Sequence, residues 1–125
     1  MRTILLVEDN ELSRDALSRR LRRRGYQVAL AEDGQQAVSM ASSEHPDLII
    51  MDLGLPKIDG WEATRRLKTD IGTRHIPIIV LSAHAMTGDR EMAIAAGSDE
   101  FDCKPVKFER LVSKIELLLA TSVTQ

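Results

Sequence analysis

The chain has 125 residues, enough for one domain that buries a core without disulfides or a structural metal. A formal net charge of -2 and a pI of about 5.9 argue against a general binder of nucleic acid or membrane surfaces, which would carry a clear basic excess. The single cysteine, Cys103, excludes an internal disulfide, and no stretch approaches the roughly 18 apolar residues of a membrane span, so we expect a cytoplasmic protein.

Apolar runs of strand length recur along the chain, separated by longer stretches with helical spacing. The runs are TILLV (3–7), YQVAL (26–30), DLIIM (47–51), IPIIV (76–80) and EFDC (100–103). LIIM and IIVL are apolar at consecutive positions, which is typical of strands covered on both faces. The predicted fold class is therefore α/β, with a doubly wound parallel sheet between two layers of helices.

The first helix ends before Gly25, which lies where a left-handed C-cap belongs. Its apolar residues share one face, which comprises Leu12, Ala16, Leu17 and Leu21. This spacing predicts a helix that packs against the sheet.

Start signals also mark the later helices. Asp33 is the expected N-cap of the second, and Asp59 with Glu62 forms a D-x-x-E box at the start of the third. The fourth is expected from about residue 86 to residue 97, and Pro105 marks the entry to the fifth. The apolar stripe of the fifth helix comprises Phe108, Leu111, Val112, Ile115 and Leu119.

Polar side chains follow the predicted strands where four of the five end. They are Glu8 and Asp9 after the first strand, Asp52 after the third, Ser82 after the fourth and Lys104 after the fifth. In a doubly wound sheet, ligands bind outside the carboxyl ends of the strands. We therefore expect these side chains to face one crevice.

Carboxylates that share one crevice repel one another and favour a bound cation. Oxygen ligands without histidine or cysteine favour Mg²⁺, for which Mn²⁺ could substitute, over zinc or copper. Asp52 is the predicted nucleophile for an acyl phosphate because it ends the central apolar strand, while Glu8 and Asp9 are better placed to share the metal. Lys104 would supply a charge, and Ser82 a hydroxyl, for the phosphoryl oxygens.

The segments LLVEDNE, PDLIIMDLGLPKIDGWEA, IPIIVLSAHA and DEFDCKPV occur in a characteristic order and spacing. Together they resemble the receiver domain of bacterial two-component response regulators, the CheY-like fold, over essentially the whole chain. The resemblance implies a flavodoxin-like sheet of five parallel strands in the order 2-1-3-4-5 with five helices, in a domain over 1–120 with a tail at 121–125. Among single-domain members, RHIPIIVLSAHAMTGDREMAIAAG is most similar to the DivK-like regulators.

The resemblance also implies roles for individual residues. Asp52 would accept the phosphoryl group from a phosphohistidine on a sensor histidine kinase or a histidine phosphotransfer protein. Asp9 and Asp52 would hold Mg²⁺ directly, Glu8 would act through water, and the backbone carbonyl of Gly54 would complete the protein ligands. Gly54 and His84 lie where receivers tune the lifetime of the phosphoryl group.

A switch on phosphorylation is implied as well. Ser82 would turn toward the phosphoryl group while Phe101 swings inward, which alters a face built from the fourth helix, the fifth strand and the fifth helix. That face would bind a downstream effector protein. We expect the chain to be a monomer or a weak dimer, and we expect no nucleic-acid or membrane partner. The peptide bond before Pro105 would be cis, an isomer whose free-energy cost is small only at X–Pro bonds.

Some features leave alternatives open. Asp102 departs from the family pattern, where an apolar residue is commoner, and it either pairs with a cation or sits exposed on an edge strand. The basic run 19–24 is a solvated helix end that complements the helix dipole, or it steers an acidic partner through Arg19, Arg22 and Arg23.

The same residues disfavour two other functions. A Mg²⁺-dependent phosphohydrolase would want a second acid two residues after the nucleophile, where this chain has Gly54, so we expect no enzyme beyond self-phosphorylation and slow autodephosphorylation. A nucleotide carrier would want a glycine- or hydroxyl-rich loop in place of EDNE. A chain that starts with Met1 at the first strand and ends just after the fifth helix favours a standalone protein, although the receiver of a hybrid kinase or phosphorelay has the same features.

Overall fold

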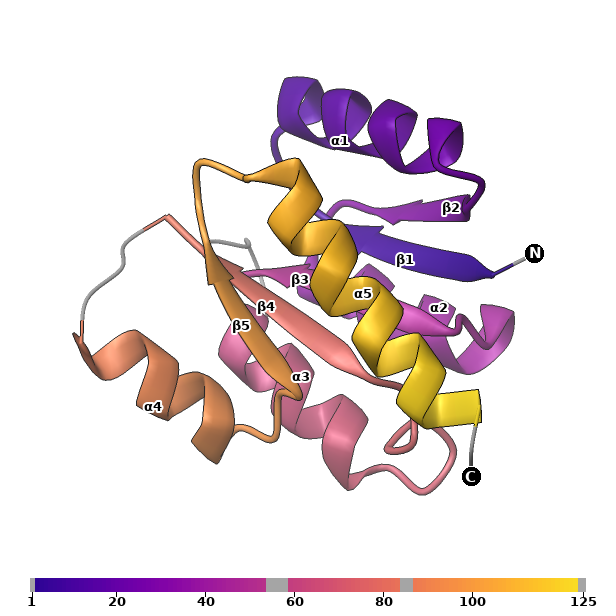
Figure 1. The fold of residues 1–125 in the computed structure, drawn as a ribbon. Helices are drawn as coiled ribbons and strands as arrows, with labels where there is room; N and C mark the ends of the chain where they lie inside the picture. Colours follow the sequence, from indigo (N-terminus) through magenta and orange to yellow (C-terminus); the bar gives the residue numbers. More distant parts are fainter. Residues whose placement is uncertain (1, 54–58, 84–86, 124–125) are drawn as a thin grey trace.

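The computed structural model describes residues 2–53, 59–83 and 87–123, which form one parallel sheet with helices on both faces (Figure 1). The strands are β1 Thr3–Val7, β2 Gln27–Ala31, β3 Leu48–Asp52, β4 Ile78–Ser82 and β5 Glu100–Cys103. Their order in the sheet is β2-β1-β3-β4-β5, and every neighbouring pair is parallel. The predicted fold class and strand order are therefore confirmed.

The helices alternate with the strands along the described chain. They are α1 Glu11–Arg23, α2 Gly34–Glu44, α3 Gly60–Thr69, α4 Thr87–Ala95 and α5 Phe108–Val123. One apolar layer joins the sheet to α1 and α5, and the other joins it to α2, α3 and α4, as the two sides of the ribbon show (Figure 1). No described helix has the length and apolar character that crossing a bilayer requires.

The ends of several elements differ from the expected ones. β4 begins two residues later than the run IPIIV, because Pro77 has no N–H for a ladder bond and Ile76 still closes a turn onto Thr73. The fourth helix ends at Ala95, short of residue 97, and its expected first residue, 86, lies outside the described residues. α5 continues to Val123, past residue 120, where the sequence placed the domain end.

Side-chain caps fix where the helices begin. The carboxylates of Asp33 and Asp59 accept hydrogen bonds from the N–H groups of Gln36 and Glu62, at 2.8 and 2.9 Å, as predicted. Asn10 caps α1 in the same way, although the sequence analysis did not identify it. At the other end of α1, Gly25 takes a φ of 100°, which confirms the left-handed position expected there.

The core confirms the stripe of α5 but only part of that of α1. All five stripe residues of α5 are buried, whereas in α1 Leu21 is buried, Leu17 is half-buried and Leu12 is 82% exposed. The first turn of α1 lies beyond the carboxyl end of β1, outside the apolar layer, so burial of Leu12 was a wrong expectation. Leu12 and the likewise exposed Ala16 leave an apolar surface at the end of the sheet where the polar residues gather.

Candidate functional site

Charged groups from three strands meet at the carboxyl edge of the sheet. Glu8 follows β1, Asp52 ends β3 and Lys104 follows β5, and the Nζ of Lys104 lies 2.9 Å from Glu8 Oε1 and 3.2 Å from Asp52 Oδ1. Ser82 ends β4 and is 3% exposed, one residue beyond the register partner of Asp52. The order of the parallel strands in the sheet brings together side chains that are up to 96 residues apart in the sequence.

Three carboxylates form the acidic side of this site. One oxygen each of Glu8, Asp9 and Asp52 lies within 4.8 Å of the others, with Glu8 and Asp52 buried and Asp9 exposed. Burial raises the pKa of Glu8, and the neighbouring Asp52 carboxylate raises it further, while hydrogen bonds from Lys104 and from the N–H of Asn10 oppose the shift. The carboxylates thus repel one another enough to favour a positive charge between them.

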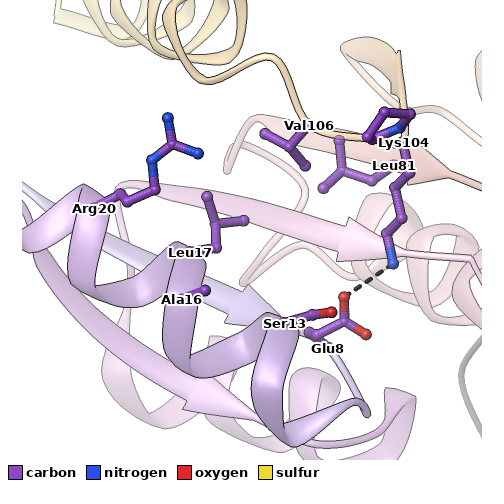
Figure 2. A pocket seen from close by; sticks show the side chains of 9 residues that line it. Glu8, Ser13, Ala16, Leu17, Arg20, Leu81, Lys104 and Val106 are labelled. Atoms are coloured by element: carbon purple, nitrogen blue, oxygen red, sulfur yellow. Dashed lines mark hydrogen bonds and ion pairs between the residues drawn. The ribbon is translucent and has the colours of Figure 1, made fainter.

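Lys104 supplies one such charge. Burial alone would lower the pKa of its ammonium group, but the hydrogen bond to Glu8 and the negative charge of Asp52 outweigh burial and raise that pKa. Its side chain extends across the crevice to Glu8, as Figure 2 shows. We conclude that Lys104 stays charged at neutral pH and faces both buried acids.

The donor set suits a hard divalent cation. All three groups offer carboxylate oxygens, and together they carry more negative charge than the single ammonium of Lys104 can balance. Mg²⁺ is typically bound by one or two carboxylates with several waters, so the cluster fits this ion. Gly54, the expected carbonyl ligand, lies outside the described residues, as does His84, the other expected tuning position.

A glycine at the start of α3 allows the backbone to pass close to Asp52. A Cβ on Gly60 would clash with the carbonyl oxygen of Asp52 and would lie 2.8 Å from the Cα of Leu53. Real Cβ atoms do not come that close to backbone, so only glycine fits this contact. The cap at Asp59 was predicted from the sequence but this requirement was not, although the pair Asp59-Gly60 could have indicated it.

Replacing Gly60 with alanine should lower the unfolding free energy by about 1–3 kcal/mol, because backbone must move to relieve the clash. Urea denaturation measures the loss. Gly72→Ala is the matched control, since a Cβ there meets only a side-chain oxygen of Asp70 at 3.4 Å. Equal stability of the two variants would contradict the close approach.

Two further predicted residues lie beside the site. Phe101 on β5 is 6% exposed and packs in the same core cluster as Ala93 of α4. The peptide bond between Lys104 and Pro105 is cis, the isomer that the family resemblance implied. The role of Phe101 as a switch stays a prediction.

The guanidinium of Arg14, which the sequence analysis did not single out, supports the first strand end. Its Nη1 donates to the backbone carbonyl of Glu8 at 2.9 Å, and the N–H of Glu8 donates to the carbonyl of Ala31 at 3.1 Å. These bonds fix the backbone from which the Glu8 carboxylate projects. Arg14 therefore connects α1 to the acidic cluster.

A groove of about 310 Å³ opens directly beside Lys104 and Glu8, between α1 and the segment that leads into α5 (Figure 2). Its apolar wall includes Ala16, Leu17 and Val106, and Arg20 lies at its far end from Glu8. Arg20 also stacks on the ring of Phe108, with 4.3 Å between its guanidinium carbon and the ring centroid. The site is thus continuous with an apolar surface that carries a positive charge.

Comparison with known proteins gives a consistent result over most of the chain. The family profile of the response regulator receiver domain matches residues 4–116. The polar-differentiation response regulator DivK of Brucella ovis is 36% identical over 118 residues, which cover 94% of this chain and 96% of that protein.

Solved structures agree with this match. The receiver domain of sensor histidine kinase PA1611 from Pseudomonas aeruginosa, which has a magnesium ion coordinated in its active site cleft, is 39% identical, with a TM-score of 0.89 over 95% of this chain and 98% of that one. The receiver domain of a signal transduction histidine kinase from Syntrophus aciditrophicus is 35% identical, with a TM-score of 0.90 over 97% of this chain and 92% of that one.

Proposed function

This chain belongs to the response regulator receiver family, and on that basis we propose that it accepts a phosphoryl group on Asp52 from a phosphohistidine donor in a Mg²⁺-dependent reaction. The observation that carries the proposal is the buried cluster in which Lys104 contacts both Glu8 and Asp52. Such a cluster has a nucleophile, a positive charge and carboxylate oxygens of the kind that hold a metal. It therefore contains the parts that an aspartyl phosphate requires.

Each side chain has a distinct role in this proposal. Asp52 provides the attacking oxygen, and Lys104 holds the phosphoryl oxygens by charge. Ser82, at the neighbouring strand end, donates its hydroxyl to the same group. Glu8, Asp9 and Asp52 would hold Mg²⁺, which supplies positive charge for the phosphoryl oxygens when bound.

Intact mass spectrometry after incubation with acetyl phosphate tests this function. We expect one added phosphoryl group in the presence of Mg²⁺ and none after EDTA treatment, because the carboxylates then repel the anionic donor. Mn²⁺ should restore the addition, since its ligand preference is similar. Phosphorylation that is unchanged in EDTA would contradict the metal-dependent mechanism.

The groove beside Lys104 is the proposed docking surface for the phosphohistidine donor. It opens onto the acidic cluster, and its apolar wall on α1 suits an amphipathic helix that carries the histidine. Arg20 and the neighbouring arginines of the 19–24 run would favour a donor with acidic residues near that helix. A histidine kinase or a histidine phosphotransfer protein fits this description.

Replacing Ala16 with arginine should lower the second-order rate constant for transfer from a phosphohistidine protein by roughly tenfold or more, since a long charged side chain would fill the groove. The rate with acetyl phosphate should not change, because this small donor needs no docking surface. Ile71→Arg, an exposed site in the loop between α3 and β4 at the far end of the sheet, is the control. Equal loss with both donors would contradict docking at the groove.

A receiver within a hybrid kinase or phosphorelay is the second candidate, because two similar solved structures are receivers of histidine kinases. In either setting we propose a signalling module that hydrolyses its own phosphoryl group only slowly. Gly54 stands where a phosphohydrolase of this type would have a second acid. We also propose a cytoplasmic protein whose effector binds the face formed by α4, β5 and α5, with a monomer or weak dimer as the active form.

A further inference from the structure

One of the two outer edges of the sheet is formed by β5, which pairs with β4 on one side only. Just past its end, the N–H of Lys104 donates to the carbonyl of Ser82 in β4 at 2.7 Å. Backbone groups of alternate residues point to the same side of a strand, so those of Phe101 and Cys103 point to the free side. An edge strand with free backbone groups on that side is open to pairing with other chains.

Side chains of the protein itself occupy these backbone groups. The N–H of Phe101 donates to Glu100 Oε1 at 3.0 Å, and the carbonyl of Phe101 accepts a hydrogen bond of 2.7 Å from the Nζ of Lys114 in α5. The N–H of Cys103 donates to Asp102 Oδ1 at 2.8 Å. The edge of β5 is therefore covered by charged side chains, two of them its own and one from α5.

Asp102 lies at the centre of this arrangement. Its side chain is 5% exposed. It accepts two hydrogen bonds from Arg110, at 3.1 Å from Nε and 2.6 Å from Nη2, which is the bidentate geometry of a strong arginine–carboxylate pair. Lys114 adds a third positive contact at 3.7 Å. Of the two alternatives open for Asp102, pairing with a cation is the one observed.

The electrostatics agree with a carboxylate that is held firmly. Burial alone would raise the pKa of Asp102, but the hydrogen bonds from Arg110 and from the N–H of Cys103, with the charge of Lys114, outweigh burial and hold that pKa below its usual value. A buried ion pair is nevertheless weak evidence for stability, since apolar residues of similar size often replace one without loss.

The position of the Asp102–Arg110 pair links it to the acidic cluster. Asp102 holds the N–H of Cys103, and the next residue is Lys104, whose Nζ must reach Glu8 and Asp52. Arg110 lies in the first half of α5, so its contact with Asp102 fixes the end of β5 against that helix. A small displacement of a charged group from its reacting partner is costly to phosphoryl transfer.

We propose that Asp102 is a positioning residue: held by Arg110, it fixes the end of β5 so that Lys104 stays in contact with Glu8 and Asp52. The placement of Lys104 is independent of the proposed function, and only its consequence for phosphoryl transfer rests on that function. The described contacts of the Asp102 side chain are with Cys103, Arg110 and Lys114 and include no member of the acidic cluster, so it acts through the backbone of Cys103.

Competitive labelling of lysines with acetic anhydride measures the placement directly. In the wild-type chain Lys104 should react slowly, because it is paired with two carboxylates. In Asp102→Val and in Arg110→Met its acetylation rate should rise on the order of fivefold, as expected when one hydrogen-bonded contact that holds it is lost. Lys68, which is paired with Asp99, should keep its rate and thereby report that the fold is intact.

Arg110→Met keeps the experiment informative if Asp102→Val fails to fold, because the Arg110 side chain is 43% exposed and lies outside the core. Arg66→Met is the matched control: a helix arginine 47% exposed and paired with Glu62. Lys104 labelling that is unchanged in Arg110→Met, or that rises equally in Arg66→Met, would overturn the proposal.

A second measurement separates this proposal from the proposed function. With saturating Mg²⁺, Arg110→Met should slow phosphorylation by acetyl phosphate on the order of fivefold with unchanged Mg²⁺ affinity. The same substitution should cause no further loss in a Lys104→Met background, because the effect passes through Lys104. An equal loss in both backgrounds would contradict positioning, whereas a wild-type chain that accepts no phosphoryl group would contradict only the proposed function.

Discussion

Replacing Asp52 with asparagine should abolish phosphoryl acceptance while the chain remains folded. An amide oxygen is a far weaker nucleophile than a carboxylate, so no acyl phosphate can form at this position. The substitution also removes one of the acids that repel Glu8, which lowers the pKa of Glu8 toward its usual range. Intact mass after incubation with acetyl phosphate and Mg²⁺ measures the loss, and circular dichroism measures the fold.

Asp15→Asn is the matched control, since this aspartate on α1 is 53% exposed and pairs only with Arg19 among the described contacts. It should accept one phosphoryl group at the wild-type rate. If Asp52→Asn were phosphorylated to the same extent as Asp15→Asn, the assignment of Asp52 as the acceptor would be wrong.

Replacing Lys104 with methionine should slow phosphorylation by a factor on the order of 10²–10³, the usual cost of losing one charged group that stabilises a developing anion. Mg²⁺ affinity should be spared, because Glu8, Asp9 and Asp52 remain and lose a cation that competes for their oxygens. The phosphoryl mimic beryllofluoride should then bind without the backbone shifts in α4, β5 and α5 that we expect it to cause in the wild-type chain.

Mg²⁺ titration and amide chemical shifts, with and without beryllofluoride, measure both effects. Lys107→Met is the control, because this lysine is exposed and lies just before α5. Shifts on that face of the same size in Lys104→Met and in the wild-type chain would show that the switch does not depend on this lysine.

Much of the fold follows from patterns that are local in the sequence. The apolar run of β3 and the stripe of α5 are long and regular enough to identify each element, and both are buried as expected. The ends of elements were harder to predict where a single residue interrupts the hydrogen-bond ladder, as Pro77 does just before β4. Leu12 shows the limit of such patterns, because apolar spacing does not reveal where the opposing surface ends.

The candidate site was predictable because the carboxyl ends of parallel strands lie at the same edge of the sheet. The residue at each strand end, which can be read from the sequence, is therefore close in space to the others. That rule brings Glu8, Asp52 and Lys104 together without knowledge of any side-chain contact. Contacts that depend on packing between elements were not predictable in this way. The close approach of Gly60 to Asp52 and the pairing of Asp102 with Arg110 each depend on how a helix sits against a strand.

Reduction with borohydride identifies an aspartyl phosphate at Asp52 directly. Borohydride converts an acyl phosphate of aspartate to homoserine, so the modified position can be read by peptide mass spectrometry. After incubation with acetyl phosphate and Mg²⁺, we predict homoserine at position 52 and at no other aspartate. Homoserine at a different position, or a phosphoryl group that resists reduction, would show that Asp52 is not the acceptor.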